Sequence, residues 1–436
     1  MPTSSDRKPR PRPAPLSQIR VLELSRILAG PWAGQTLADL GARVIKVERP
    51  GTGDDTRSWG PPFAKRPGDP ADGPTGDAAY FLCANRGKRS VTIDFTQPEG
   101  QKIVRALARQ SDVVIENFKV GGLEKYGLDY ASLRADNPGL VYCSITGFGQ
   151  TGPYRERPGY DFLIQGMSGL MSITGEPDSA PGGKPVKVGV AVTDLLTGLY
   201  AVIAIQGALA HRANTGVGQH IDLSLLDVQA AALANQALNY LVSGRAPGRL
   251  GNAHPNIVPY EAFQTSDGHI ILAVGNDAQF ARFCEVAGRR ELANDARFAS
   301  NPSRVENRDS LIPLLKKLLK ARSSADWLAA LEQAGVPCGP INDIEQLFAD
   351  PQVKARGLQI AIPDPDRAAG DDGAAQPGVA SPIRFSETPI QYELPPPRLG
   401  QHTDEVLREE LQLDAAERER LRDLGVIGGR IPEKDP

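Results

Sequence analysis

The first 145 residues alternate between strand-like and helix-like segments, and this alternation limits the fold more than any other feature. Ile19–Leu24 and the alternating Arg43–Glu48 have the composition of strands. Between them, Pro31 is well placed in the first turn of a helix that Gly41 ends. A strand, a helix of about ten residues and a second strand form a βαβ unit, which predicts a parallel sheet.

The same pattern continues along the chain. Gly51–Asp77 is rich in Gly, Pro and Asp and is predicted to be an irregular surface loop. Further strands are predicted at 91–95, 112–118, 139–145 and 219–225, and further helices at 98–109, 123–136, 161–173 and 227–241.

A second region has a different texture, because a hairpin around Thr265–Gly268 is followed by three predicted helices, at 277–287, 307–319 and 324–333. We therefore expect an α/β protein with a Rossmann-like large domain and a smaller α+β domain. The predicted segments are a disordered basic tail over 1–15, the large domain over 16–225, the small domain over 226–340, and a linker with a C-terminal segment over 341–436 that returns to the large domain. Within the last segment, 361–378 is predicted to be a linker and 404–411 and 415–424 to be helices.

Composition excludes several classes of protein. A formal net charge of −3 and the lack of a long basic face argue against a nucleic-acid partner. Four widely separated cysteines fit neither a disulfide framework nor a CxxC metal site, so we expect a reducing compartment, the cytoplasm. The apolar run 195–210 is too short for a comfortable membrane span, so we expect a buried helix and no membrane partner.

Familiar nucleotide and hydrolase motifs are absent from the sequence. The turn Ser25–Pro31 contains only Gly30 where a dinucleotide-binding turn needs three glycines, and no GxxxxGK[ST] segment is present. Ser168 lacks the spacing of a nucleophile elbow. No His or Cys cluster has metal-ligand spacing, so no metal is expected. Three glycines within 147–152 indicate unusual backbone angles or a close approach to a ligand.

One carboxylate, Asp194, stands at the start of an almost wholly apolar helical stretch. Spacing alone favours a helix-start acid, which the helix dipole stabilises by roughly 0.3–1 kcal/mol. The alternative is a carboxylate nucleophile, which must be partly stripped of water and still ionised. A helix N-terminus in an apolar wall supplies both conditions.

Several blocks of the sequence resemble the class III CoA-transferases, the CaiB/BaiF or formyl-CoA transferase family. Four further stretches are most similar to the members that transfer CoA from succinyl-CoA to glutarate; they are 53–63, 189–200, 257–263 and 399–403. The blocks shared with the family as a whole are 24–31, 39–49, 85–90, 116–118, 144–149 and the Asp194 stretch.

The resemblance implies a CoA-transferase in which Asp194 is the nucleophile. An acyl-aspartyl anhydride and an aspartyl-CoA thioester would be the covalent intermediates, with succinyl-CoA as donor and glutarate or a similar dicarboxylate as acceptor. It further implies a CoA thioester as substrate, no permanently bound cofactor, and an interlocked homodimer.

The resemblance also implies the binding residues. For CoA these are Arg26, Ile27, Leu28, Ala29, Arg49, Ile93, Asp94, Phe95, Thr96, Asn117, Phe118, Lys119, Lys125, Ile145, Thr146, Gly147 and Phe148. For the active-site loop they are Gly251, Asn252, Ala253 and His254, which depart from the polyglycine loop of formyl-CoA transferase. A diacid needs a partner for its distal carboxylate, for which the candidates are Arg57, Arg86, Tyr160 and His254.

Two other functions stay open at this point. The family includes acyl-CoA racemases with a catalytic histidine in a Gly-His-Asp context, but this chain has Gly159-Tyr160-Asp161. A tyrosine, with an ordinary pKa of about 10, is a poor replacement for that base, which favours the transferase. The other alternative is a CoA-thioester binding protein without catalytic activity.

Overall fold

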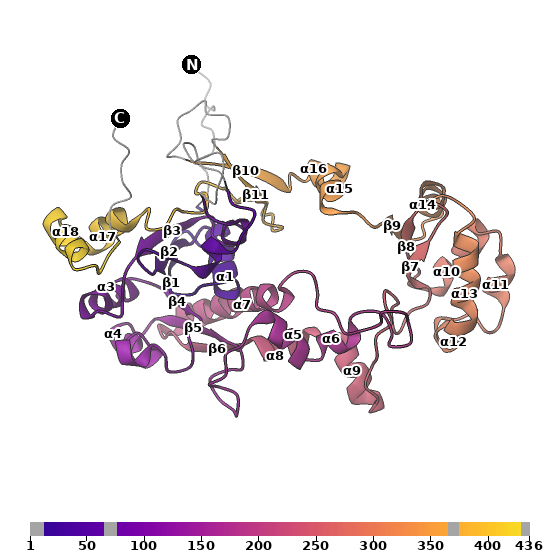
Figure 1. Ribbon diagram of the computed structural model, residues 1–436, viewed down its shortest axis with the longest axis horizontal. Coiled ribbons are helices and arrows are strands. Elements are labelled where there is room, and N and C mark those ends of the chain that lie inside the picture. The colour runs from indigo at the N-terminus through magenta and orange to yellow at the C-terminus, as the bar shows by residue number, and fades with distance from the viewer. Residues whose placement is uncertain (1–12, 65–75, 365–374, 429–436) are drawn as a thin grey trace, which may run out of the picture. The chain divides into compact units, whose positions relative to one another are not determined.

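The structure is a computed structural model that describes residues 13–64, 76–364 and 375–428 (Figure 1). The described residues form two units, each with its own core. Residues up to 168, 189–234 and 354–428 belong to the larger unit, and 169–188 and 235–353 belong to the smaller one. Residues 169–188 were predicted to belong to the large domain. Residues 1–12 of the predicted tail lie outside the described residues.

A six-stranded parallel sheet is the centre of the larger unit, which confirms the predicted α/β fold. The strand order is β3-β2-β1-β4-β5-β6, so the order reverses between β1 and β4. Open α/β sheets bind ligands beyond the carboxyl ends of the strands at such a point. The strands are β1 (Arg20–Glu23), β2 (Arg43–Glu48), β3 (Lys88–Thr92), β4 (Val113–Glu116), β5 (Val141–Thr146) and β6 (His220–Ser224).

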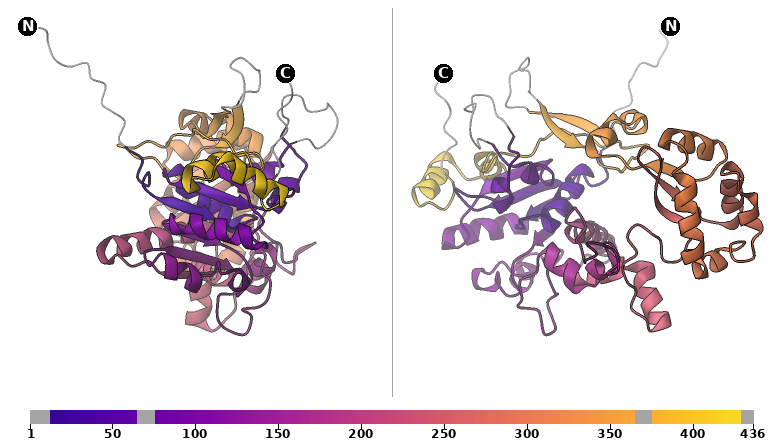
Figure 2. Two further views of the ribbon diagram at one scale, coloured as in Figure 1. Left: turned by 90° about the vertical axis from the view of Figure 1, so that its left-hand side faces the viewer. Right: turned by 45° about the vertical axis from the view of Figure 1, so that its right-hand side comes forward.

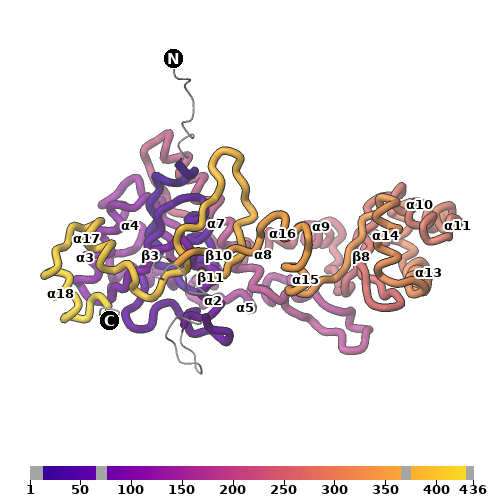
Figure 3. Tube along the Cα trace, turned by 90° about the horizontal axis from the view of Figure 1, so that it is seen from above, coloured from indigo at the N-terminus to yellow at the C-terminus, as the bar shows by residue number. Residues whose placement is uncertain are grey.

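Helices cover both faces of this sheet. Val21 and Val44 pack in the layer with α1 and α7, whereas Leu22 and Ile45 pack in the layer with α3, α17 and α18. The C-terminal helix α17 lies beside α3, as Figures 1 and 3 show. The helices are α1 (Ala29–Asp39), α2 (Ala79–Leu82), α3 (Pro98–Arg109), α4 (Tyr130–Asp136), α5 (Asp161–Met167), α7 (Val192–Thr215), α8 (Leu225–Ala232), α16 (Pro351–Ala355), α17 (Thr403–Leu411) and α18 (Ala415–Asp423), with the 3-10 helices η1 (Asp55–Ser58) and η2 (Glu124–Tyr126).

Three predicted helices are interrupted at residues with a left-handed backbone. Gly127, with φ of 63°, separates η2 from α4 inside the predicted helix 123–136. Gly169, with φ of 92°, separates α5 from α6, and Ala234, with φ of 47°, follows the end of α8. The predicted linker 361–378 was wrong in part, because β10 (Gln359–Pro363) and β11 (Ala375–Val379) form an antiparallel pair, orange in Figure 2.

The smaller unit combines a three-stranded antiparallel sheet with helices packed around Phe263, Phe280 and Trp327. The hairpin predicted around Thr265–Gly268 is confirmed as β7–β8. Its elements are α6 (Leu170–Ile173), α9 (Ala234–Ser243), β7 (Tyr260–Gln264), β8 (His269–Ala273), α10 (Asp277–Val286), α11 (Arg290–Asn294), α12 (Asn301–Glu306), α13 (Arg308–Leu319), α14 (Ser324–Gln333), β9 (Cys338–Pro340) and α15 (Ile344–Ala349).

Within the described part of the chain, α7 alone is long and apolar enough to cross a membrane. It packs against α1, α8 and the sheet of the larger unit, and Ala201 and Ile205 are fully buried in that core. Gly198 permits the close approach of α1, since a Cβ there would lie 2.7 Å from the carbonyl oxygen of Ala29. α7 is therefore a core helix of the larger unit.

Three charged side chains are fully buried beneath the carboxyl edge of the sheet. The Nζ of Lys46 on β2 lies 3.0 Å from Oε1 of Glu23 on β1, and the Nζ of Lys88 on β3 lies 2.8 Å from Oε2 of the same carboxylate. All three side chains are 0% exposed. β3 begins at Lys88 and not at the predicted residue 91. The charged residue at its start can be buried because it pairs with Glu23 on β1.

Removal of the shared carboxylate should destabilise the fold strongly. Glu23→Gln leaves the buried ammonium group of Lys88 without its carboxylate partner and leaves Lys46 with Asp54 alone, so we expect the free energy of unfolding to fall by about 3–5 kcal/mol. Urea denaturation followed by circular dichroism measures this change. The control is Glu99→Gln, which removes an exposed pair with Lys102 and should cost less than about 0.5 kcal/mol. Equal losses in the two variants would contradict the prediction.

Candidate active site

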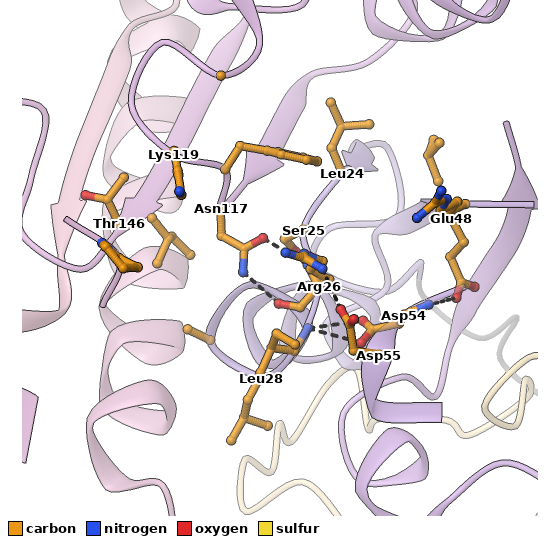
Figure 4. A pocket seen from close by; sticks show the side chains of 18 of the residues that line it. Leu24, Ser25, Arg26, Leu28, Glu48, Asp54, Asp55, Asn117, Lys119 and Thr146 are labelled. Atoms are coloured by element: carbon orange, nitrogen blue, oxygen red, sulfur yellow. Dashed lines mark hydrogen bonds and ion pairs between the residues drawn. The ribbon is translucent and has the colours of Figure 1, made fainter. Parts of the chain in front are cut away.

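A cavity of about 730 Å³ lies at the carboxyl edge of the sheet in the larger unit. Residues that follow β1, β2, β3, β4 and β5 line it, and Figure 4 shows several of their side chains around the loop after β1. Asp194 in α7 and Leu225 in α8 also line it. The cavity therefore lies where the strand order reverses, the position expected of a ligand site in an open α/β sheet.

The loop after β1 is held in a strained conformation. Ile27 has φ of 73°, a left-handed value that costs a β-branched residue on the order of 1–3 kcal/mol. Its N–H donates to both carboxylate oxygens of Asp54 at 3.2 Å. The side-chain amide of Asn117 accepts from the N–H of Arg26 at 3.0 Å and donates to its carbonyl at 2.6 Å (Figure 4). Segments after β2 and β4 thus fix the loop after β1.

The buried charges support the same loop from below. The Nζ of Lys46 donates to the carbonyl of Ser25 at 2.8 Å and lies 3.0 Å from Asp54. Burial alone would lower the pKa of Lys46, but the charges of Glu23, Asp54 and Glu48 outweigh it and raise that pKa. For Lys88 burial prevails, and its pKa falls to about 8 despite Glu23. Lys46 therefore stays charged and connects the strained loop to the sheet.

Asp194 lies in the first turn of α7 and exposes only 8% of its surface. Burial is the larger cause, and the charge of Asp161 the smaller one, of a rise in the pKa of Asp194 to about 7. The positive end of the helix dipole stabilises the carboxylate anion by roughly 0.3–1 kcal/mol. The side chain is therefore a partly desolvated carboxylate whose ionised form is disfavoured by burial.

The glycine-rich segment after β5 forms part of the cavity wall. A Cβ on Gly147 would lie 2.6 Å from the Cα of Gly159, so the two backbones meet where neither residue has a side chain. Both glycines line the cavity. Gly149 and Gly152 have left-handed φ angles of 87° and 85°. The predicted close approach is thus between two segments of the chain itself.

Both basic and acidic side chains line the cavity, and the basic ones suit a substrate with phosphate groups. Arg155 and Arg157 belong to this set and were missed by the sequence analysis, although their place in the loop after the glycine-rich segment was a usable signal. The guanidinium of Arg157 stacks on the ring of Tyr154 at 4.5 Å. The basic residues that line the cavity are Arg26, Lys46, Arg49, Lys119, Lys125, Arg155 and Arg157.

The structure brings nearly all of the predicted CoA residues together. Every residue of that set lines the cavity except Phe148, and so do Asp194 and Tyr160. Phe148 is instead buried in the core under α7, where its ring packs edge-on against Tyr154 at 5.5 Å. The side chain of Phe148 thus packs in the core, and its predicted contact with CoA stays a prediction.

The two predicted acid-binding arginines do not line the cavity. Arg57 pairs with Glu48 at 2.7 Å and with Asp77 at 2.9 Å, and it lies over the ring of Phe81. Arg86 forms two hydrogen bonds with Asp39, of 2.8 and 2.6 Å. Both guanidinium groups are buried and paired, so their predicted role with the substrate is corrected to a structural one.

The predicted loop Gly251–His254 belongs to the smaller unit. The N–H of His254 donates to the carbonyl of Tyr260 at 2.9 Å, and the guanidinium of Arg308 donates to the carbonyl of His254 at 3.0 Å. Burial, followed by the charge of Arg308, lowers the pKa of His254. The imidazole is therefore neutral at neutral pH, and its role at the substrate stays a prediction.

Comparison with known proteins decides the family. Residues 16–403 match the model of CoA-transferase family III. The chain belongs to CoA-transferase family III. It is 57% identical over 398 residues to the succinate–glutarate CoA-transferase of Agrobacterium fabrum, which covers 91% of this chain and 96% of that protein. It is 43% identical over 413 residues to the human succinyl-CoA:glutarate CoA-transferase, and the match covers 95% of this chain and 90% of that protein.

Solved structures agree with this family. A CaiB/BaiF family protein from Brucella suis has a TM-score of 0.78 and 54% identity, covering 92% of this chain and all of that one. The Rv3272 protein of Mycobacterium tuberculosis has a TM-score of 0.76 and 31% identity, and the match covers 90% of this chain and 98% of that one. The CoA-transferase described here thus acts on a CoA thioester, and the cavity with its basic side chains has the charge that such a substrate requires.

The raised pKa of Asp194 predicts that Asp194→Asn stabilises this CoA-transferase at pH 8. The folded-state pKa of about 7 lies above the unfolded value of about 3.9, so the folded protein loses stability as the pH rises through this window. Asparagine avoids this penalty, and we expect a gain of roughly 1–3 kcal/mol at pH 8 and a smaller one at pH 5.

Thermal unfolding at the two pH values measures the gain. The control variant is Asp136→Asn, because that exposed carboxylate is paired with Arg105 and its pKa is lowered. It should show no gain at pH 8. An Asp194→Asn variant no more stable than the wild type at pH 8 would contradict the assignment of Asp194 as a desolvated carboxylate.

Proposed function

We propose that the enzyme transfers CoA from succinyl-CoA to glutarate or a similar dicarboxylic acid, with Asp194 as the nucleophile. The observation that carries this proposal is the buried carboxylate of Asp194, at a helix start and in the wall of a basic cavity, in a chain of this family. The substrate pair is supported by the names of the Agrobacterium and human relatives.

The proposed chemistry begins with attack on the donor thioester. An oxygen of Asp194 bonds to the thioester carbonyl carbon, the C–S bond breaks, and an acyl-aspartyl anhydride and CoA thiolate form. The thiolate then attacks the aspartyl carbonyl, which releases succinate and leaves an aspartyl-CoA thioester. The acceptor carboxylate repeats these two steps in reverse, and acyl-CoA and free Asp194 are regenerated. The thioester energy is conserved throughout.

The surroundings of Asp194 suit this sequence of steps. Partial burial strips water from the carboxylate, which makes it a better nucleophile, and the helix start stabilises the anion. The basic residues around the cavity other than the buried and paired Lys46 would pair with the phosphates of CoA, with the strained loop after β1 close to them.

The distal carboxylate of the acid needs its own partner. Arg57 and Arg86 are no longer candidates, because both are paired inside the protein. Arg155 and Arg157 replace them, since both line the cavity in the segment that leads to Tyr160. Tyr160 lines the cavity where the racemases of this family have a histidine base, and a phenol is too weak a base for that proton transfer. The site therefore favours CoA transfer.

Exchange between acids tests this function directly. The wild-type enzyme, incubated with succinyl-CoA and a panel of dicarboxylic acids, should form new thioesters that mass spectrometry identifies, with glutarate among the best acceptors. Asp194→Asn should abolish exchange and the hydroxylamine-trappable adduct. The control variant is Asp129→Asn, which replaces the N-cap carboxylate of α4 by an amide at a position outside the cavity. This variant should retain activity. Activity of the Asp194→Asn variant would refute the nucleophile, and failure with every diacid would refute the substrate class.

We also propose that the enzyme functions as an interlocked homodimer. Large apolar side chains are exposed on both units, such as Ile203 on α7 at 64% and Val242 on α9 at 84%. Exposed apolar surface of this kind is typical of an interface between protein chains. Light scattering after gel filtration should give twice the mass of one chain, and a mass of 46.7 kDa would contradict the proposal.

A further inference from the structure

A second buried carboxylate, Asp161, lies beside the nucleophile at the start of α7. It is the first residue of α5 and exposes 9% of its surface. Its Oδ1 accepts a hydrogen bond from the N–H of Thr193 at 2.8 Å and a longer one from the N–H of Asp194 at 3.4 Å. Asp161 does not line the cavity. It therefore contacts the backbone of the nucleophile and has no surface on the substrate side.

α7 needs this carboxylate because it cannot cap itself. The N-cap residue is Ala191, whose methyl side chain accepts no hydrogen bond. The first N–H groups of a helix have no partner within the helix, and leaving one unpaired in a buried place costs on the order of 1–3 kcal/mol. Asp161 accepts from two of these groups, so a residue 33 positions away in the sequence supplies the cap.

Other side chains hold the same turn and its cap. The amide of Gln165, one turn along α5, donates to Oδ2 of Asp161 at 2.6 Å. On the helix side, the hydroxyl of Thr193 donates to Oε1 of Gln229 in α8 at 2.7 Å, and the hydroxyl of Thr197 donates to the carbonyl of Thr193 at 2.7 Å. The first turn of α7 is thus fixed between α5 and α8.

We propose that Asp161 is a positioning residue for CoA transfer: its carboxylate caps the turn that carries Asp194 and places a second negative charge beside the nucleophile. The inference rests on the proposed role of Asp194. The cap fixes the direction of the attacking oxygen, and the charge makes the nucleophile more basic. A more basic carboxylate is a stronger nucleophile once it is ionised. Asp161 should therefore lower kcat at low pH, where Asp194 is protonated, and raise kcat above neutral pH, where Asp194 is ionised.

The charge environment of Asp194 is consistent with this role. Asp161 raises the pKa of Asp194, and burial followed by the charges of Asp194, Cys83 and Asp161 raises the pKa of Tyr80 to about 12. Of the other helices packed against α7, α8 carries Asp227, whereas the first two turns of α1 carry no titratable side chain. Asp161 is therefore the neighbouring charge that raises the pKa of Asp194, in addition to burial.

Two substitutions separate the cap from the charge. Asp161→Asn keeps an oxygen that can accept from the N–H of Thr193 and removes the negative charge. The acidic midpoint of the pH profile of kcat should therefore move down by about 0.5–1 pH unit, with kcat at pH 8 within a few-fold of the wild type. Asp161→Ala removes both functions and should lower kcat about tenfold or more at every pH.

A stability cycle tests the charge without any activity assay. At pH 8, Asp194→Asn should raise Tm by less in the Asp161→Asn background than in the wild type, because the neighbouring charge is already gone. The control is Asp129→Asn, which makes the same exchange at the N-cap of α4 and should change neither the cycle nor the pH profile.

The outcomes distinguish this inference from the proposed function. If the wild type exchanges CoA but Asp161→Asn leaves the acidic midpoint unchanged, or Asp161→Ala retains full kcat, the inference is overturned and the transferase stands. If the wild type exchanges no CoA, the proposed function fails, and additive Tm changes in the cycle would overturn the inference as well. If Asp161→Ala does not fold, the pH profile and the Tm cycle of Asp161→Asn decide.

Discussion

The shared carboxylate of Glu23 is the interaction on which the catalytic edge of the sheet depends. It lies between two fully buried ammonium groups, from Lys46 and Lys88, so β1, β2 and β3 are held in register at the point where the cavity begins. A buried ion set of this kind contributes little net stability, but loss of one member leaves an uncompensated charge. In this protein the ion set also supports the strained loop at Ile27, because Lys46 donates a hydrogen bond to the carbonyl of Ser25.

The state of Asp194, the proposed nucleophile, also depends on its neighbours. Burial disfavours the ionised form of Asp194, and the positive end of the α7 dipole opposes this effect in part. Because Ala191 offers no cap, α5 supplies one through Asp161, and the carboxylate that completes the helix also raises the pKa of Asp194. Packing, helix capping and proposed reactivity are therefore linked in a single turn of α7.

Local pattern predicted most of the elements of this fold. The strand Arg43–Glu48 and the helices Pro98–Arg109 and Ser324–Gln333 have the predicted bounds. Their bounds follow from local features of the sequence, namely the period of the apolar residues and the residues at the ends of each element. Two of the errors occurred where a partner distant in the sequence decides the structure. β3 starts early because Lys88 is neutralised by Glu23, and the hairpin of β10 and β11 joins residues that composition alone places in a linker.

The sequence by itself determined which loops follow strand ends, and hence which residues surround the cavity, since the carboxyl ends of parallel strands share one edge. It also marked Asp194 as an unusual acid. Only the tertiary structure decided which basic residues are free to meet a substrate: Arg57 and Arg86 are paired with buried carboxylates, while Arg155 and Arg157 line the cavity. The physical reason is that the availability of a charge depends on its partners in space, and neither spacing nor residue type records them.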